Sequence, residues 1–319
     1  MKFLPIFYFP TTLVFVDDDR SMLDAYEECF AERFNCSVFK NLNEAYAFFD
    51  NYKSKITKLS LLELLEDIEL ENPEYQAAIQ LDFSKILDIY RNRNKNQEVS
   101  VAILDCFIES ENDGIALAKH LESHQFKKML STQDSDYEKA TDELSNKTID
   151  YFLNKFDPQN LDKKAPFKKL KKVIQDLATS YFIEITEEVK KHLRHSGVSA
   201  IFDPIFIEYF QGILQEKNIV EYYMIDKQGS YLLKSNNGIE YILIVHTDKS
   251  MQDFTGLLGE YEEFSEITKL INQKKSIPFL GIHKTILDID ISNIQDYIVQ
   301  NPEKILGKSN YYVVLKELG

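Results

Sequence analysis

Short apolar runs alternate with segments of helical periodicity over the first half of the chain. Continuous apolar runs such as Leu13–Val16, and the stretch VSVAILD that ends at Asp105, are typical of strands buried on both faces of a parallel sheet. Ser21–Phe34 and Leu42–Phe49 carry apolar residues at spacings of three and four and predict helices. Together with Ser37–Phe39 and the stretches DGIALAKHLES, KKMLS, SDYEKATDEL and IDYFLNK, this predicts a doubly wound α/β domain with a parallel five-stranded sheet.

Two longer helical patterns interrupt or follow this alternation. Residues 55–97 contain LSLLELLEDIEL and AAIQLDFSKILDIY, separated by Asn-Pro, and predict a helical insertion within a domain of residues 1–165. Apolar residues then recur at helical spacing from Phe167 to Leu193, up to the stop signal Gly197. Residues 166–197 are therefore predicted to form a fifth helix that continues as a linker helix. Its long apolar stripe suggests a homodimer contact, although packing within one chain explains the stripe equally well.

The last part of the chain, residues 198–319, has a different pattern. A predicted helix, IFDPIFIEYFQGILQEKN, precedes three predicted strands, VEYYMID, GSYLLKS and EYILIVHTD, with turns between them. A helix around MQDFTGLLGEYEEFSEITKLINQ, the stretch SIPFLGI, a short helix around ISNIQDYIVQ and a final strand YYVVLKEL complete the pattern. This predicts an α+β domain with an antiparallel sheet, of PAS-like or profilin-like shape.

The composition limits the classes of function. A net charge of −15 at pH 7 disfavours nucleic acid as a partner, because an acidic surface repels phosphates. The three cysteines, Cys29, Cys36 and Cys106, lack a C-x-x-C spacing, which favours a reducing, cytoplasmic location without disulfides or a zinc site. No apolar stretch reaches the ~18 residues of a membrane span, so none is expected.

Chemically distinctive side chains stand at the carboxyl ends of four predicted strands. In chain order they are Asp17, Asp18 and Asp19, Asp105, Ser131 and Thr132, and Lys155. Because the carboxyl ends of parallel strands meet at one edge of a sheet, we expect these side chains to converge. Carboxylate oxygens suit Mg²⁺, a lysine suits a phosphoryl group, and an aspartate such as Asp105 can accept that group covalently.

These residues, in this order, resemble the receiver domain of two-component response regulators over residues 11–177. The stretch DGIALAKHL, from Asp113, is similar to the helix opening of that family. The resemblance implies that Asp105 accepts a phosphoryl group from a sensor histidine kinase or a phosphotransfer protein. It further implies Mg²⁺ as the cofactor, held by Asp17, Asp18, Asp105 and the backbone carbonyl of Phe107.

The resemblance also implies how the phosphoryl group is sensed. Lys155 would pair with the phosphoryl group, and Phe152 would be the aromatic residue that turns inward. Ser131 would be the switch hydroxyl, with the adjacent Thr132 as the alternative. The chemistry expected of such a domain is limited to its own phosphorylation and dephosphorylation.

The sequence therefore predicts a response regulator of a phosphorelay, in which phosphorylation controls a C-terminal protein-interaction or sensing domain. Two alternatives stay open. One is a pseudo-receiver scaffold that is never phosphorylated, and the other is a regulator with an unrecognised enzymatic or DNA-binding output. No helix-turn-helix, P-loop or Gly-rich dinucleotide pattern is recognised in the C-terminal region.

Overall fold

The chain forms two units, each built from separate segments. The computed structural model describes residues 3–56, 83–132, 137–155, 167–187, 189, 200–258, 264–281 and 296–318. Within these limits, the parallel-sheet unit comprises Phe9–Lys58 and Asn92–Ile185. The antiparallel-sheet unit comprises Met1–Tyr8, Leu59–Arg91 and Thr186–Gly319. This division differs from the expected segments 1–165, 166–197 and 198–319, because Met1–Tyr8 and the part of the insertion up to Arg91 belong to the antiparallel-sheet unit.

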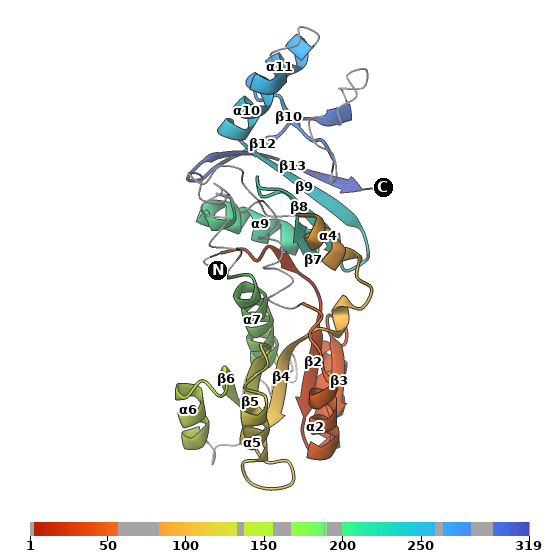
Figure 1. Cartoon of the computed structure of the whole chain (residues 1–319), viewed down its shortest axis with the longest axis vertical. Helices are drawn as coiled ribbons and strands as arrows, with labels where there is room; N and C mark the ends of the chain where they lie inside the picture. The colour runs from red at the N-terminus through yellow and green to blue at the C-terminus, as the bar shows by residue number, and fades with distance from the viewer. Residues whose placement is uncertain are drawn as a thin grey trace, which may run out of the picture. The chain divides into compact units, whose positions relative to one another are not determined.

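The parallel-sheet unit contains five strands in the order β3-β2-β4-β5-β6, all parallel, as the sequence predicts (Figure 1). The strands are β2 (Thr12–Val16), β3 (Asn35–Phe39), β4 (Val99–Asp105), β5 (Lys127–Thr132) and β6 (Tyr151–Asn154). The helices are α1 (Arg20–Phe30), α2 (Leu42–Asn51), α5 (Asp113–His120), α6 (Tyr137–Ser145) and α7 (Lys168–Ile185), and the short helix η2 (Lys95–Gln97) precedes β4. The strand order reverses between β2 and β4, which is where ligands bind in folds of this kind.

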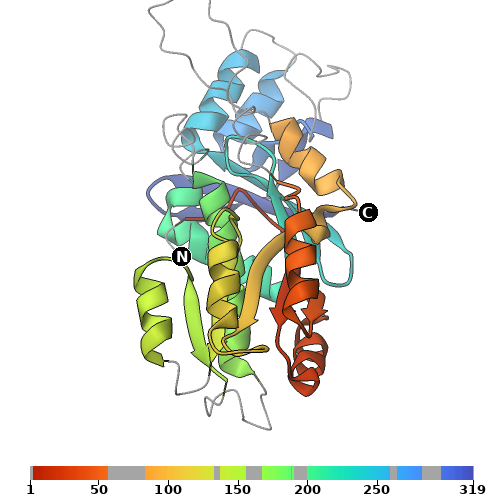
Figure 2. The same ribbon diagram turned by 60° about the horizontal axis from the view of Figure 1, so that its bottom comes forward.

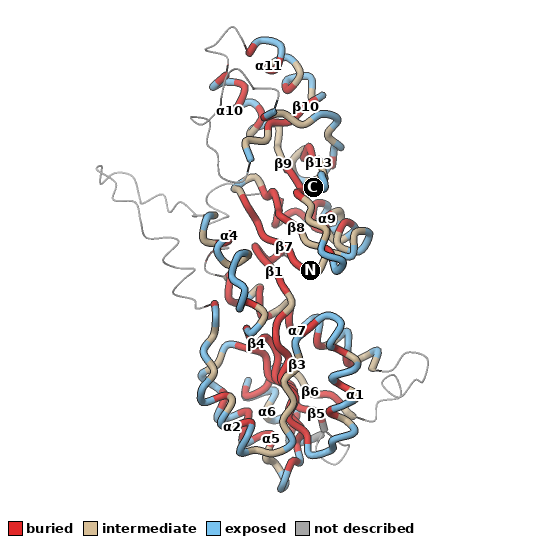
Figure 3. The backbone as a smooth tube through the Cα atoms, turned by 90° about the vertical axis from the view of Figure 1, so that its right-hand side faces the viewer, coloured by how far each residue is buried: buried red, intermediate tan, exposed pale blue. Residues whose placement is uncertain are grey.

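The core of this unit lies between the sheet and the helices. Every residue of β2 and β4 is buried, whereas the helices contain both buried and exposed residues (Figure 3). Helices α1 and α7 pack on one face, where Tyr26 and Ile174 meet Phe15 in a single apolar cluster. Helices α2 and α5 contact each other, and α5 contacts β4. Figure 2 shows helices of this unit on both sides of its strands. Burial on both faces thus stabilises the apolar strands, and the polar side chains lie at their carboxyl ends.

The apolar stripe of α7 is buried within the chain. Leu170, Ile174 and Ala178 belong to the same apolar cluster as the strands, and Tyr181, Phe182 and Ile185 are also buried. Of the two explanations given for the stripe, packing within one chain therefore accounts for its described residues. Most of the predicted linker extension, at 188 and 190–199, lies outside the described residues, as does the LSLLELLEDIEL part of the insertion.

The antiparallel-sheet unit contains a six-stranded sheet in the order β1-β7-β8-β9-β13-β12 and a separate two-stranded sheet, β10-β11. The strands are β1 (Phe7–Tyr8), β7 (Ile219–Met224), β8 (Tyr231–Ser235), β9 (Glu240–Thr247), β10 (Ser276–Pro278), β11 (Ile298–Gln300), β12 (Glu303–Leu306) and β13 (Asn310–Leu318). The helices are α4 (Phe83–Arg91), η4 (Ala200–Phe202), α9 (Pro204–Glu216), α10 (Asp248–Leu258) and α11 (Ser265–Asn272). An antiparallel sheet is confirmed, but residues 298–300 form a strand where a helix was predicted.

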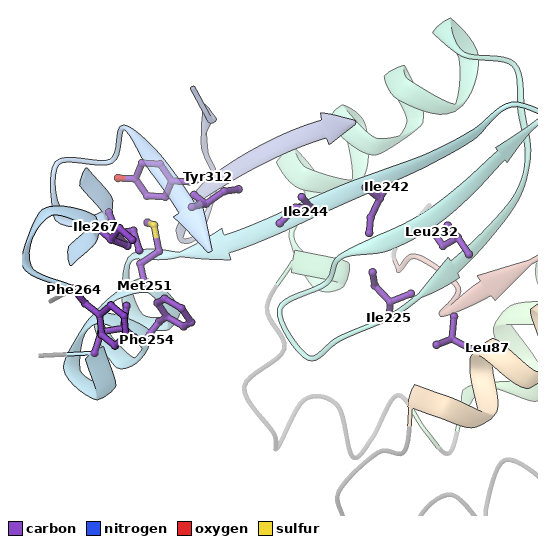
Figure 4. Packing of buried hydrophobic residues seen from close by; sticks show 13 residues of the cluster. Leu87, Ile225, Leu232, Ile242, Ile244, Met251, Phe254, Phe264, Ile267 and Tyr312 are labelled. Atoms are coloured by element: carbon purple, nitrogen blue, oxygen red, sulfur yellow. The ribbon is translucent and has the colours of Figure 1, made fainter. Parts of the chain in front are cut away.

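The insertion contributes its last helix to this second sheet. Leu87 of α4 belongs to the apolar cluster that contains Ile225 and Leu232 (Figure 4). The Tyr90 ring meets Tyr223 of β7 edge-on at 5.2 Å, and the Tyr90 hydroxyl donates to Glu240 of β9. The chain therefore leaves the parallel-sheet unit after β3 and α2, adds a helix to the antiparallel-sheet unit, and returns to form β4. Across the described ranges, no helix is both long and apolar enough for a membrane span.

Candidate functional site

Three aspartates meet at the carboxyl edge of the parallel sheet. Asp17 follows β2 directly and is buried, Asp18 beside it is exposed, and Asp105 ends β4 and is 6% exposed. One carboxylate oxygen from each of the three lies within 4.8 Å of the others. The convergence expected from the strand ends is therefore present for these residues, and it forms an acidic pocket.

Lys155, which follows β6, provides the positive charge of the pocket. Its Nζ atom lies 2.6 Å from Oδ2 of Asp105 and 2.8 Å from Oδ2 of Asp17, and its side chain is 7% exposed. The Asp105 contact is a well-formed hydrogen bond. The Asp17 contact joins the same lysine to a second buried carboxylate. One lysine therefore serves two buried carboxylates, while Asp18 adds a third negative charge.

The charge balance of the pocket shifts the pKa values of its groups. Burial raises the pKa of Asp105 to about 6, although Lys155 acts in the opposite direction, and Asp17 adds to the rise. Burial likewise raises the pKa of Asp17, against the effect of Lys155. Burial by itself lowers the pKa of Lys155, but the two carboxylates outweigh it and raise that pKa. Burial thus makes the negative charges of Asp17 and Asp105 costly, and a hard divalent cation would relieve this electrostatic cost.

The donor set agrees with a magnesium site. Mg²⁺ prefers carboxylate oxygens and usually binds through one or two of them, keeping several waters. Asp17, Asp18 and Asp105 offer such oxygens on adjacent strands, and Asp18 is open to solvent. Phe107 lies two residues after Asp105, and its backbone N–H donates to Oδ1 of Asp105 at 3.4 Å. Its carbonyl as a metal ligand stays a prediction.

The hydroxyl and the aromatic residue expected from the sequence lie on neighbouring strands. Ser131 is 3% exposed and is the register partner of Asp105 across β4 and β5, so both side chains point to the same face of the sheet. The side chain of the alternative, Thr132, lies outside the described residues, so Ser131 as the switch hydroxyl stays a prediction. Phe152, in the middle of β6, is half-buried.

A glycine makes the loop beyond Asp105 possible. A Cβ atom on Gly114 would overlap the backbone carbonyl oxygen of Asp105, and the Gly114 N–H donates to the carbonyl of Cys106 at 3.3 Å. Only glycine allows the start of α5 to approach the end of β4 so closely. The Asp-Gly at the start of DGIALAKHL thus has a steric reason.

Gly114→Ala should therefore destabilise the protein by about 2 kcal/mol, because a methyl group must push β4 and α5 apart. Gly212→Ala is the control, since Gly212 lies within α9 with no atom near the added Cβ, and it should change stability by at most about 1 kcal/mol in the favourable direction. Urea unfolding of both variants measures the difference. Equal stabilities would show that the loop relaxes around the added methyl group without cost.

Tyr26 is a residue of the pocket whose only signal in the sequence is its helical spacing within Ser21–Phe34. It lies in α1, 2% exposed, and its ring stacks on Phe15 with centroids 4.9 Å apart. Burial raises its pKa to about 12, while a hydrogen bond from Ser131 lowers it, and the charges of Asp17, Lys155 and Asp105 reach it as well. The hydroxyl of Tyr26 therefore faces the charged pocket. The helical spacing of Tyr26 accounts for the burial of its ring, but no signal in the sequence indicates where its hydroxyl lies.

Fold and pocket together define the class. The parallel-sheet unit has the fold of a response-regulator receiver, with an acidic pocket formed by Asp17, Asp18 and Asp105, and the chain contains an additional antiparallel-sheet unit. Over 99% of its length the chain is similar in structure to the Legionella pneumophila response regulator LqsR, of which it covers 89%. The TM-score is 0.74 and the sequence identity is 20%, so the similarity concerns the fold.

Other solved structures match about half of the chain. The adenylate cyclase from Rhodopirellula baltica gives a TM-score of 0.37 at 14% identity, with 57% of this chain and 96% of that chain covered. The response regulator TrrA from Thermotoga maritima, in complex with Mg(2+)-BeF, gives 0.31 at 16% identity, with 52% and 98% covered. No protein-family model and no curated protein matches the sequence.

Proposed function

We propose that the chain is a response regulator that accepts a phosphoryl group on Asp105 and relays this state to its antiparallel-sheet unit. The observation that supports this most directly is the buried Lys155, in contact with both Asp17 and Asp105 beside the exposed carboxylate of Asp18. A lone structural ion pair needs one carboxylate for one lysine. A surplus of acidic oxygens at a topological switch point is instead what a metal-assisted phosphoryl acceptor requires.

The proposed reaction is an in-line transfer from a phosphohistidine. A carboxylate oxygen of Asp105 attacks phosphorus, the P–O bond forms, and the P–N bond to the histidine breaks. Lys155 is already held at the acceptor and balances the charge of the transferred group. Asp105 must be ionised to attack, and Lys155 favours that form against the effect of burial. Asp17, Asp18 and Asp105 would hold Mg²⁺, which neutralises the negative charge of the incoming group.

The proposed switch uses the hydroxyl beside the acceptor. Ser131 shares the sheet face of Asp105, so it can donate a hydrogen bond to a phosphoryl oxygen, and Phe152 on the neighbouring strand would turn inward as Ser131 moves. Tyr26 contacts Ser131 and would hold its hydroxyl in the unphosphorylated state. Such a switch biases an existing equilibrium rather than creating a new state.

The proposed partner is a sensor histidine kinase or a phosphotransfer protein in the cytoplasm. The antiparallel-sheet unit would act as a protein-interaction or sensing output, and the expected PAS-like or profilin-like shape is the reason for the sensing alternative. A homodimer through α7 and its extension stays part of the proposal. Since the stripe of α7 is buried, such a contact would have to use residues beyond Ile185 or the polar side of the helix.

The test of the function is phosphorylation by a small donor. With acetyl phosphate and Mg²⁺, intact-mass spectrometry should show a mass gain of one phosphoryl group. The same reaction in the presence of a chelator should show no gain. A protein that gains no mass under conditions that label a known receiver would instead be a pseudo-receiver scaffold.

Asp18→Ala should weaken Mg²⁺ binding by at least tenfold, because a carboxylate that ligates the metal carries much of the affinity. Titration of Mg²⁺ by calorimetry measures the affinity. Asp24→Ala is the control, since Asp24 lies exposed in α1 and pairs with Arg20 at 2.9 Å, so it should bind Mg²⁺ like the wild type. Equal affinities in Asp18→Ala and the wild type would place the metal elsewhere.

A further inference from the structure

Another buried carboxylate lies at the opposite end of the strand that carries the acceptor. Glu98 directly precedes β4, which ends at Asp105, and it is 1% exposed. Its Oε1 atom accepts hydrogen bonds from the hydroxyls of Tyr52 at 3.1 Å, of Ser54 at 2.7 Å and of Tyr181. Its Oε2 atom accepts from the backbone N–H groups of Lys55 and of Ile56, the latter at 3.2 Å. Both oxygens of this buried carboxylate are thus surrounded by donors.

The donors around Glu98 are neutral, and they stay so. Burial, followed by the charge of Glu98, raises the pKa of both Tyr52 and Tyr181, so the phenols keep the protons that they donate. Losing one of these donors removes a hydrogen bond from a buried carboxylate, which is costly. The segments that supply the donors are therefore held to the start of β4 together.

These segments are the ones that lead to the other unit. The chain passes between the two units at four places, after residues 8, 58, 91 and 185. The donors at 52–56 directly precede the second passage, and Tyr181 of α7 directly precedes the fourth. Glu98 itself follows the third.

The first passage is fastened to the same point through the backbone. The N–H of Thr12 donates to the carbonyl of Glu98 at 2.7 Å, and the hydroxyls of Thr11 and Ser100 lie 2.5 Å apart. All four passages therefore meet the parallel-sheet unit around one residue. We call this group, Thr11, Thr12, the segment 52–56, Glu98, Ser100 and Tyr181, the Glu98 node.

On the far side of these passages the chain enters well-packed elements of the antiparallel-sheet unit. Helix α4, which ends at the third passage, contacts β7 through Tyr90 and Tyr223. Strand β1, which ends at the first passage, pairs with β7 in the register Phe7↔Tyr223. Two of the four passages thus lead from Glu98 to the same strand, β7.

We propose that the Glu98 node couples the state of the Asp105 pocket to β1, α4 and β7 of the antiparallel-sheet unit. This rests on the proposed function. Segment 52–56 and α7 bind the carboxylate of Glu98, and Thr12 binds its backbone carbonyl, so a rearrangement of the sheet on phosphorylation that moves the start of β4 would displace these segments together. Contiguity of contacts does not demonstrate coupling, so the proposal requires a direct measurement of it.

The experiment is hydrogen–deuterium exchange on the full chain, with and without Mg²⁺ and beryllofluoride, which stands in for the phosphoryl group. In the wild type, the ligand should slow exchange around residues 105–115 and change exchange in α4 and β7 several-fold. Glu98→Gln keeps the size of the side chain but turns an NH₂ group toward the donors. It should keep the protection at the pocket and lose the change in α4 and β7.

Two further variants separate coupling from folding. Tyr181→Phe removes one donor and leaves the rest of the node, so it should fold and show a reduced change in α4 and β7. Glu184→Gln removes a carboxylate of the same helix that pairs with Lys127 instead of the node, and it should behave like the wild type. The proposal is overturned if the pocket is protected without any change in α4 and β7, or if Glu98→Gln and Tyr181→Phe both keep the full change. A wild type without protection at the pocket would overturn the proposed function, and this inference with it.

Discussion

Asp105→Asn is expected to reduce labelling by acetyl phosphate to background. The carboxamide of asparagine has almost the shape of the carboxylate but cannot attack phosphorus, so the loss is chemical rather than structural. Asp105 is also the pocket carboxylate that Lys155 contacts most closely, at 2.6 Å, so no neighbouring aspartate has the same arrangement of charge. Intact-mass spectrometry in the presence of Mg²⁺, followed by peptide mapping, measures the extent and the position of the label.

Asp113→Asn is the matched control for this result. Asp113 lies eight residues further on, at the start of α5, and its carboxylate accepts hydrogen bonds from Ser110 and from the N–H of Glu109 instead of contacting Lys155. The Asp113→Asn variant should therefore be labelled at Asp105 like the wild type. Undiminished labelling of Asp105→Asn, or a label that maps to Asp17 or Asp18 in the wild type, would refute the assignment of the acceptor.

Lys155→Met is expected to destabilise the metal-free protein by about 3 kcal/mol at pH 7. The substitution leaves two buried carboxylates without their cation, and breaking a buried ion pair from one side costs roughly this amount. Urea unfolding in the presence of a chelator measures it. Lys139→Met removes an exposed lysine that pairs with Glu111 at the surface and should cost less than about 0.5 kcal/mol. Equal losses in the two variants would show that Lys155 contributes no more than a surface ion pair.

The loss of unfolding free energy caused by Lys155→Met should become smaller as the pH falls from 7 to 5. Without Lys155, the pKa values of Asp17 and Asp105 lose the influence that lowers them and rise further above their unfolded values. The folded variant then binds more protons than the unfolded chain across this interval, so a fall in pH stabilises it relative to the wild type. A deficit that stays constant between pH 7 and pH 5 would mean that the two carboxylates are not the groups that lose their partner.

The sequence by itself determined the parallel sheet and the edge at which its chemistry gathers. Continuous apolar runs separated by helical patterns are local signals, and a parallel sheet with short connections leaves few ways to order them. Once Asp17, Asp105 and Lys155 stand at strand ends, the topology brings them together. These residues could therefore be placed in one pocket before any coordinates were known.

Tertiary structure decided which unit each outlying segment joins. Phe7 pairs with Tyr223, and α4 of the insertion packs on the antiparallel sheet, because hydrogen bonds and apolar contacts distant in the sequence select the partner. An apolar stripe such as that of α7 indicates that it will be covered, but not by what, and its own chain covers it. The hydroxyl of Tyr26 and the carboxylate of Glu98 acquire their surroundings only from residues brought together by folding. Their roles could not be read from local spacing, since a buried polar group is defined by its partners and not by its position in the chain.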